Sequence, residues 1–275
     1  ERGTQCCFRL LKKLTIRSAI ILLVSVGTVL LAVYTFRIPL QYRYEDLMYL
    51  LNPTAERAFA YGERHFSAPN AAEYDVNRAR LFFRLAAHSN PNLPYVHHEL
   101  ARVYFLNGNF QSALAEINIQ INAQGDNVPS SYYVRGLIEG FMGNYAASIK
   151  DYAHYLQIDP YDWAAINDYA WVLLKYNRPK DALSITTIAL NYFPKNPWLL
   201  NTNATARYET GDIDGAKEKV LEAHTALQTL TRETWLRAYP GNDPAIAQAG
   251  ISAFKKSVDD NMHTLGAVST STQQN

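Results

Sequence analysis

One short cluster in the sequence has residue types that could bind a metal ion: His97, His98 and Glu99. Zinc proteases of the His-Glu-x-x-His type place two histidines four residues apart on one face of a helix. The residue four positions after His98 is Arg102, and adjacent histidines point about 100° apart on a helix. We therefore expect no metal site in this chain.

No other pattern indicates catalysis or a bound cofactor. The sequence lacks the Gly-x-Ser-x-Gly nucleophile turn, the phosphate-binding P-loop and the glycine fingerprint of dinucleotide-binding proteins. The two cysteines, Cys6 and Cys7, are adjacent, so the rest of the chain can hold neither a disulfide nor a cysteine-ligated zinc ion. We expect a protein with no enzymatic activity and no cofactor.

Composition excludes two further classes. Of 275 residues, 48% are hydrophobic, and 19 Tyr, 11 Phe and 4 Trp are too many aromatic residues for a disordered chain. Six basic residues and one acidic residue lie in residues 1–37, so 20 basic and 24 acidic residues remain in 38–275. A mildly acidic body lacks the charge of a nucleic-acid-binding protein, so we expect no nucleic acid partner.

Small residues recur along the body with a period of 34 or 35 positions. They occupy Ala79, Ala113, Ser148, Ala182 and Ala216, and a second small residue lies 12 positions before each of the last four, at Ala101, Gly136, Ala170 and Ala204. Turn-forming residues follow the same period, at Gly108, Gly143, Asn177 and Gly211. A fixed period of this length is the signature of a repeat protein.

Each repeat is predicted to be a helical hairpin. Between the markers, apolar residues follow helical spacing, as in Ala113, Leu114, Ile117 and Ile121. A short turn over residues 107–109 joins two such stretches. Small residues on facing helices let the helices approach closely, because larger side chains would hold them apart.

The pattern resembles the tetratricopeptide repeat (TPR) family. Its small–aromatic–glycine–aromatic–alanine order is matched by Ala101, Tyr104, Gly108, Phe110 and Ala113. The second unit matches at Gly136, Gly143, Tyr145, Tyr152 and Pro160. The third matches at Ala170, Ala182, Ala189 and Pro194, but Asn177 and Pro179 replace the usual glycine and aromatic residue. The fourth matches at Ala204, Gly211, Ala216 and Ala223. The resemblance covers about residues 55–228. It implies an all-α solenoid of helical hairpins and a protein-binding role.

The pattern also divides the chain into segments. We expect a basic cytoplasmic segment at 1–17, a transmembrane helix at 18–36, a linker at 37–52, a divergent first repeat with an insertion at 53–93, four repeats at 94–228, a helical cap at 229–265 and a disordered tail at 266–275. The insertion spans residues 67–75 and is either a tolerated surface loop or a functional one. Solenoids need such a cap, because the last repeat would otherwise expose its core face.

Residues 18–36 predict a membrane anchor. They form a run of 19 residues without a charge, which at about 1.5 Å per residue matches the hydrocarbon core of a bilayer. The run is longer than the core of a cleaved signal peptide, which favours a retained helix over cleavage or burial in a soluble core. Five basic residues precede the run, so the positive-inside rule predicts a cytoplasmic N-terminus and an extracytoplasmic body, most consistent with the bacterial inner membrane.

The resemblance also predicts a binding surface. First helices of TPR hairpins line the concave side of the solenoid. The side chains expected on that face are Tyr95, His98, Arg102, Phe105, Tyr133, Leu137, Phe141, Asn167, Trp171, Trp198, Asn201 and Tyr208. Aromatic side chains can hold a partner at low entropy cost, although they could equally fill contacts between repeats.

Asn167 and Asn201 lie 34 residues apart and are therefore in register in successive repeats. An asparagine amide can donate to and accept from a peptide backbone at once. The pair favours an extended peptide as the ligand. The basic cluster by which some TPR domains bind chaperone C-termini is absent, because the corresponding positions hold His98, Arg102, Val134, Ala164 and Asp168.

Together, these patterns predict a membrane-anchored TPR scaffold that binds a protein or an extended peptide in its concave groove outside the cytoplasm, as envelope, secretion or pilus assembly adaptors do. Two alternatives remain open: a non-catalytic assembly subunit of a membrane enzyme complex, and an organelle-surface import receptor with a cytosolic body. The sequence carries no pattern that specifies an oligomeric state.

Overall fold

The computed structural model describes residues 21, 23–29, 31, 40–68 and 71–267, and every regular element among these residues is helical. The chain divides into two compact units, Glu1–Pro53 and Thr54–Asn275. In the first unit, residues 40–51 form a helix within the segment predicted to be a linker. The predicted basic segment, and all but two residues of the predicted tail, lie outside the described residues.

The predicted membrane localisation requires a correction. Within the predicted anchor, the structure describes residues 21, 23–29 and 31 as helical, and residues 18–20, 22, 30 and 32–36 lie outside the described part. In the part of the chain that the structure describes, no helix combines the length and the apolar character needed to cross a bilayer. This finding contradicts the prediction of a single-pass membrane protein with a cytoplasmic N-terminus and an extracytoplasmic body.

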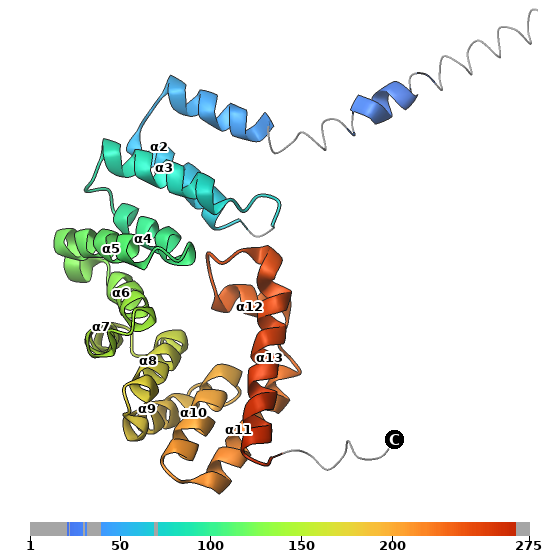
Figure 1. Ribbon diagram of the computed structural model, residues 1–275. Coiled ribbons are helices and arrows are strands. Elements are labelled where there is room, and N and C mark those ends of the chain that lie inside the picture. Colours follow the sequence, from blue (N-terminus) through green and yellow to red (C-terminus); the bar gives the residue numbers. More distant parts are fainter. Residues whose placement is uncertain (1–20, 22, 30, 32–39, 69–70, 268–275) are drawn as a thin grey trace, which may run out of the picture. The chain divides into compact units, whose positions relative to one another are not determined.

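The second unit consists of five helical hairpins followed by a helical cap (Figure 1). The hairpins are α2 (Ala55–Phe66) with α3 (Val76–Ser89), α4 (Val96–Leu106) with α5 (Phe110–Gln124), α6 (Ser130–Phe141) with α7 (Tyr145–Ile158), α8 (Trp163–Lys175) with α9 (Pro179–Leu190), and α10 (Pro197–Glu209) with α11 (Ile213–Leu227). The helical hairpins predicted from the period are confirmed. Short 3-10 turns lie at Gly125–Asn127 and Pro244–Ile246.

The hairpin turns explain the periodic glycines. Gly108, Gly143 and Gly211 have φ values of 72°, 81° and 88°, in the left-handed region that glycine adopts without steric cost. Asn177 occupies the same place in its repeat, with a φ of 58°. Asparagine is one of the few other residues that tolerate this conformation, so the substitution preserves the turn.

The small periodic residues form the contacts between paired helices. Ala79, Ala113, Ser148, Ala182 and Ala216 are all completely buried. The Ser148 hydroxyl donates to the main-chain carbonyl of a glycine on the facing helix at 2.6 Å. Such close backbone approach leaves no room for larger side chains, which is why the period is conspicuous in the sequence.

The predicted insertion connects α2 to α3, and residues 69 and 70 within it lie outside the described part. Its last residue, Asp75, caps α3 by accepting hydrogen bonds from the backbone N–H groups of Asn77 and Arg78. The Asp75 backbone N–H donates to the carbonyl of His65 at 3.1 Å, which ties the end of the loop to α2. The hydroxyl of Tyr74 donates to the carbonyl of Gly241 at 2.8 Å.

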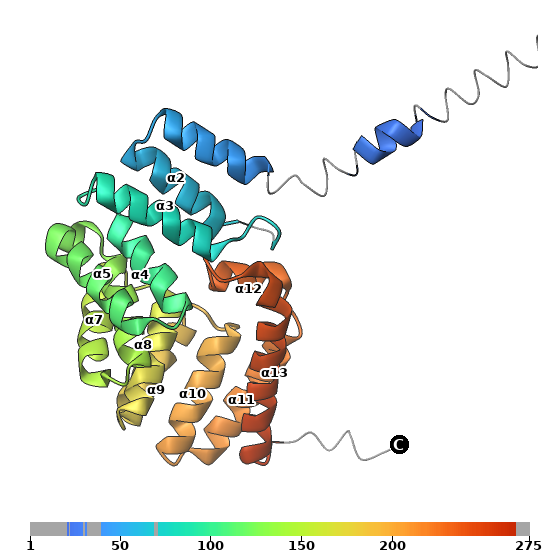
Figure 2. The same cartoon turned by 45° about the horizontal axis from the view of Figure 1, so that its top comes forward.

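The cap consists of α12 (Arg232–Ala238) and α13 (Ala247–Thr264). Figures 1 and 2 show both helices on the inner side of the curved row of hairpins, with α12 near α4 and α13 beside α10 and α11. Val258 and Leu265 of the cap pack against Val220 and Leu227 of α11 in one buried cluster. The cap therefore covers the end of the solenoid and also reaches into its concave side.

Candidate binding site on the concave face

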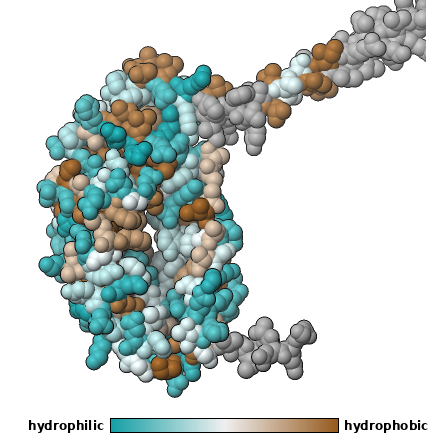
Figure 3. Space-filling view, viewed as in Figure 1, coloured by the Kyte–Doolittle hydropathy of each residue, from teal (hydrophilic) through white to brown (hydrophobic). Residues whose placement is uncertain are grey.

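Two adjoining cavities lie on the concave side, between the first helices of the hairpins and the cap. The first, here called the Arg102 cavity, has a volume of about 450 Å³ and is lined by α4, α6, α8, Tyr155 of α7 and the cap. The second, called the Asp168 cavity, has a volume of about 360 Å³ and is lined by α6, α8, α10, Tyr152 of α7 and the cap. Both volumes fall in the range of about 300–1,000 Å³ that is typical of ligand pockets. Figure 3 shows a hollow between the middle hairpins and the cap.

Nine of the twelve residues predicted for the groove line these cavities. The Arg102 cavity is lined by His98, Arg102, Phe105, Tyr133 and Leu137, and the Asp168 cavity by Tyr133, Leu137, Phe141, Asn167, Trp171 and Trp198. Their positions follow from helix geometry, because the face opposite the small packing residues of each first helix points into the concave side.

The other three predicted residues lie elsewhere. Tyr95 is at the N-terminus of α4, where its ring contacts the imidazole of His98 edge-on at 5.8 Å. Tyr208 lines a smaller cavity between α10 and α13. The Asn201 side-chain carbonyl accepts a hydrogen bond from the Asn261 amide of α13 at 2.9 Å. None of these three side chains lines the Arg102 or the Asp168 cavity, among the residues that the structure describes.

The in-register asparagine pair is engaged within the protein. The Asn167 carbonyl oxygen accepts from the Thr202 hydroxyl at 2.8 Å, and its amide donates to Asp168 at 3.4 Å. The cap holds Asn201 by the bond to Asn261 described above. The two amides therefore stabilise contacts between elements, and only Asn167 borders a cavity.

The cap contributes residues that the sequence did not suggest for the site. Ala238, Tyr239 and Asn242 line both cavities, and Arg237 and Pro240 line the first. We call residues 239–243 the cap turn. The Trp235 indole and the Tyr239 ring extend the aromatic cluster around Trp198, with ring centroids 6.1 Å from Trp198 in both cases.

Arg102 fixes the cap turn against the first two hairpins. Its guanidinium donates to the carbonyl oxygen of Pro240 at 2.8 Å and to both carboxylate oxygens of Glu99 at 2.8 and 3.0 Å. The guanidinium also lies over the Phe66 ring, 4.8 Å from its centroid. The Tyr74 hydrogen bond to the next residue of the turn reinforces this contact. The cap turn therefore bridges the N-terminal and C-terminal parts of the unit.

Two carboxyl groups lie near this arginine, that of Glu99, which is buried, and that of Glu63, which is half-buried. Burial raises the pKa of Glu99, although its bonds to Arg102 oppose the shift. Burial also raises the pKa of Glu63 to about 7; the charge of Glu99 adds to this rise, while Arg102 and a hydrogen bond from Ser67 oppose it. The Oε1 atom of Glu63 is buried and has no hydrogen-bond partner among the described residues. Arg102 is therefore paired with Glu99, whereas the neighbouring Glu63 carboxyl group keeps one oxygen without a hydrogen-bond partner among the described residues.

The two histidines of the cluster first considered for metal binding have separate structural partners. His97 Nδ1 lies 2.6 Å from a Glu116 carboxylate oxygen, and His98 Nδ1 lies 3.1 Å from the Ser131 hydroxyl. Burial, with a contribution from the positive charge of Arg102, lowers the pKa of His98 to about 3. His98 is therefore neutral at physiological pH and contributes no charge to the Arg102 cavity.

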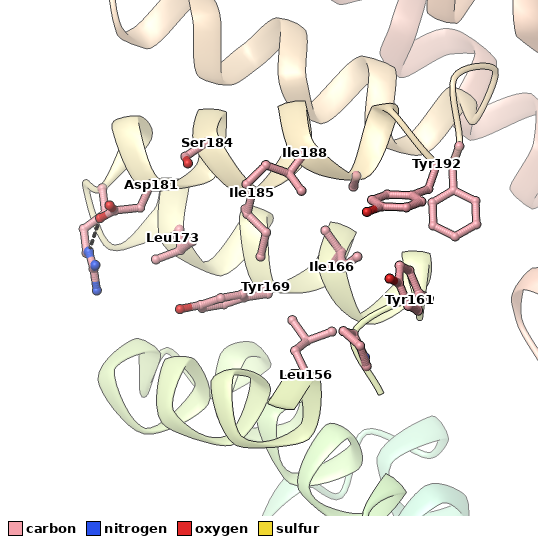
Figure 4. Close-up of a pocket in the computed structure, with 14 residues that line it drawn as sticks. Leu156, Tyr161, Ile166, Tyr169, Leu173, Asp181, Ser184, Ile185, Ile188 and Tyr192 are labelled. Carbon is pink, nitrogen blue, oxygen red and sulfur yellow. Dashed lines mark hydrogen bonds and ion pairs between the residues drawn. The ribbon is translucent and has the colours of Figure 1, made fainter. Parts of the chain in front are cut away.

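A further cavity of about 320 Å³ lies on the outer side, between α7, α8 and α9 (Figure 4). Leu156 of α7, Ile166 and Tyr169 of α8, and Ile185 of α9 point into it. None of the predicted groove residues is among the described residues that line it. The exposed side chain of Tyr192 borders this cavity and provides a comparison position for tests of the concave site.

Comparison with known proteins identifies the fold. No model of a known protein family and no curated protein matches the chain. Among solved structures, a TPR protein from Parabacteroides merdae ATCC 43184 aligns with a TM-score of 0.58 at 14% identity, covering 85% of this chain and 95% of that protein.

Two further structures give the same result. YrrB, described as a TPR protein with an unusual peptide-binding site, aligns with a TM-score of 0.55 at 12% identity, covering 67% of this chain and 93% of YrrB. MamA aligns with a TM-score of 0.53 at 14% identity, covering 57% of this chain and 91% of MamA. The chain has the fold of TPR proteins. At these identities the similarity concerns the fold, and function has to be argued from the site.

Proposed function

We propose that this protein is a non-enzymatic scaffold that binds an extended segment of a protein partner in the concave cavities. The observation that carries the proposal is that nine predicted surface residues from four successive hairpins meet around two adjoining cavities. An extended segment could follow these cavities from one hairpin to the next. The similarity of fold to YrrB, which is described as having a peptide-binding site, supports the same role.

The chemistry of the walls also supports binding over catalysis. The Phe141 ring is stacked on the Trp171 ring, with ring centroids 6.1 Å apart, and contacts the Phe105 ring edge-on, with centroids 5.1 Å apart. Phe141 nevertheless remains 57% exposed. Large aromatic side chains that remain exposed in a concave surface are typical of protein recognition sites. A partner would cover these rings and remove apolar surface from water, at roughly 25 cal/mol per Å².

Photo-crosslinking tests the proposal. The photoreactive residue benzoylphenylalanine is introduced in place of Phe141 in the full chain, within the cells that make the protein. The matched control carries the same residue in place of Tyr192, which is also 57% exposed but borders the outer cavity. We expect a protein adduct at position 141 and none at position 192. The lack of an adduct at position 141, whatever position 192 gives, overturns the proposal.

A further inference from the structure

The Asp168 cavity combines aromatic walls with one half-buried carboxyl group. Its lining includes seven aromatic side chains: Tyr133, Phe141, Tyr152, Trp163, Trp171, Trp198 and Tyr239. Among the described residues that line it, Asp168 alone is ionised near neutral pH. A small cavity of this composition is suited to a cation, because the faces of aromatic rings carry negative potential.

Among the residues that the structure describes, Asp168 has no positively charged partner. Its carboxylate accepts hydrogen bonds from the Tyr133 hydroxyl at 2.9 Å and from the Asn167 amide at 3.4 Å. These two groups are its hydrogen-bond donors within the described part of the chain, and neither carries a charge. Burial raises the pKa of Asp168 to about 6, and the charge of Asp162 adds to the rise against these two hydrogen bonds. Ionising a half-buried carboxyl group without a counter-charge is costly, and a cationic ligand would relieve that cost.

The aromatic side chains of the lining pack against one another in pairs. The Trp163 and Trp198 rings stack with centroids 5.0 Å apart, and Phe141 lies stacked near Trp171 at 6.1 Å. The Nζ atom of Lys175 lies 5.6 Å from the centroid of the Trp171 ring, so this indole already interacts with a cation. Further rings would surround a second cation inside the cavity.

A hydrogen-bond donor on one of the lining residues, Trp198, has no acceptor among the described residues. The Trp198 side chain is 8% exposed, and this donor is its indole N–H. Burial raises the pKa of Tyr239, and an interaction between its hydroxyl and this N–H lowers it by a smaller amount. A buried donor without an acceptor is destabilising, and a carbonyl oxygen of a ligand would offset that cost. The ligand would therefore carry both a cation and a carbonyl group, as a basic residue in a peptide does.

We propose that the Asp168 cavity binds a lysine or arginine side chain of the partner's extended segment, with Asp168 as the counter-ion, the surrounding aromatic rings as walls, and the Trp198 N–H donating to a backbone carbonyl. This inference rests on the proposed function and adds the charge of the ligand to it. A free small amine shares the cationic group but lacks the backbone carbonyl. The experiment therefore includes both sources of a cation.

The probes are an acetylated, amidated pentapeptide with a central lysine between alanines, the same peptide with norleucine in place of lysine, and free butylammonium. Binding to the full chain is measured by isothermal titration. We expect the lysine peptide to bind about tenfold more tightly than the norleucine peptide and than butylammonium. Equal binding of the two peptides overturns the inference, and butylammonium binding as tightly as the lysine peptide overturns the peptide as its source.

Asp168→Asn is the central variant, because it keeps the size and acceptor of the side chain and removes the charge. We expect the lysine preference to disappear, while Asp214→Asn, at an exposed aspartate of α11, retains it. We also expect Asp168→Asn to be at least as resistant to thermal unfolding as the wild type at pH 8, since it removes an uncompensated charge from a half-buried position. A variant that loses stability but keeps the lysine preference shows a structural role for Asp168 and overturns the inference.

The two proposals can fail separately. A protein adduct at position 141 together with an unchanged lysine preference in Asp168→Asn overturns the cation site and leaves the scaffold intact. A lysine preference that depends on Asp168, without a protein adduct at position 141, overturns the scaffold and leaves the cation site.

Discussion

Replacing Gly241 by alanine tests whether the cap turn is held against the first hairpins. Gly241 has a φ of 84°, and a Cβ atom there would lie 2.7 Å from an Arg102 guanidinium nitrogen and 2.9 Å from the Phe66 ring. The left-handed conformation costs a side chain about 1–2 kcal/mol. Overpacking against two neighbours adds about 1–3 kcal/mol. The substitution therefore opposes docking of the turn by about 2–5 kcal/mol.

The contacts that hold the turn have a similar magnitude. The charge-assisted bond from Arg102 to Pro240 contributes about 1.5–3 kcal/mol, and the bond from Tyr74 to Gly241 about 0.5–1.5 kcal/mol. Because the cost of the alanine is comparable to the gain from docking, we expect the turn to separate from α4 while the hairpins stay folded. The variant isolates the cap turn from the stability of the solenoid.

Hydrogen exchange measured by mass spectrometry reads this out directly. In Gly241→Ala, we expect the backbone amides of α12 to exchange at least tenfold faster, because each 1.4 kcal/mol is a factor of ten in the opening equilibrium. Amides of α8 and α9 should be unchanged. The matched control is Gly266→Ala, which also has a positive φ, of 63°, but no atom within 4 Å of the added Cβ. Equal exchange of α12 in both variants would refute the docking described here.

Three further changes are expected to have defined effects. Ala113→Leu or Ala182→Leu should lower the free energy of unfolding in urea by about 1–3 kcal/mol, because both alanines are completely buried between paired helices. An unchanged urea midpoint of unfolding in both variants would show that the repeat register is wrong. The pKa of Glu63 is raised from 4.5 to about 7 in the folded chain, so the free energy of unfolding of the wild type falls as the pH rises from 4.5 through 7. Glu63→Gln should therefore be more stable than the wild type by about 1 kcal/mol at pH 8, after allowance for solvent screening, and no more stable at pH 4. An equal gain at both pH values would contradict this sign. Asn261→Ala should destabilise the contact of α13 with Asn201 by about 0.5–1.5 kcal/mol, seen as faster exchange in α13 alone.

The repeat architecture could be predicted from the sequence because its determinants are local. Two small residues 12 positions apart must face each other across a hairpin, and the turn between them requires a left-handed residue such as Gly143 or Asn177. These constraints recur in every unit, so the period is visible without any knowledge of distant contacts. The helix at 40–51 was not predicted, because it lies outside the periodic region, and the membrane localisation inferred from residues 18–36 was wrong.

The concave residues could be predicted for the same reason, since the packing face of a first helix determines which side chains point the other way. The positions of Asn201 and Tyr208 depend instead on α13, a helix that carries no repeat pattern. Nothing local in the segment around Tyr239 indicates that it returns to the concave side. That contact is specified by pairs far apart in the chain, such as Arg102 with Pro240.

The position of the cap turn has a consequence for binding. Tyr239 and Asn242 border both concave cavities, so a ligand in either cavity contacts the same segment that Arg102 and Tyr74 hold in place. Docking of the turn and binding of the ligand are then linked equilibria, and each must change the other by the same free energy. A ligand that binds better with the turn in place should protect α12 from exchange, and Gly241→Ala should weaken its binding. A ligand that binds better without the turn should have the opposite effect on both measurements. The direction of change in α12 exchange and in ligand affinity therefore tells whether the cap turn forms part of the binding site or blocks it.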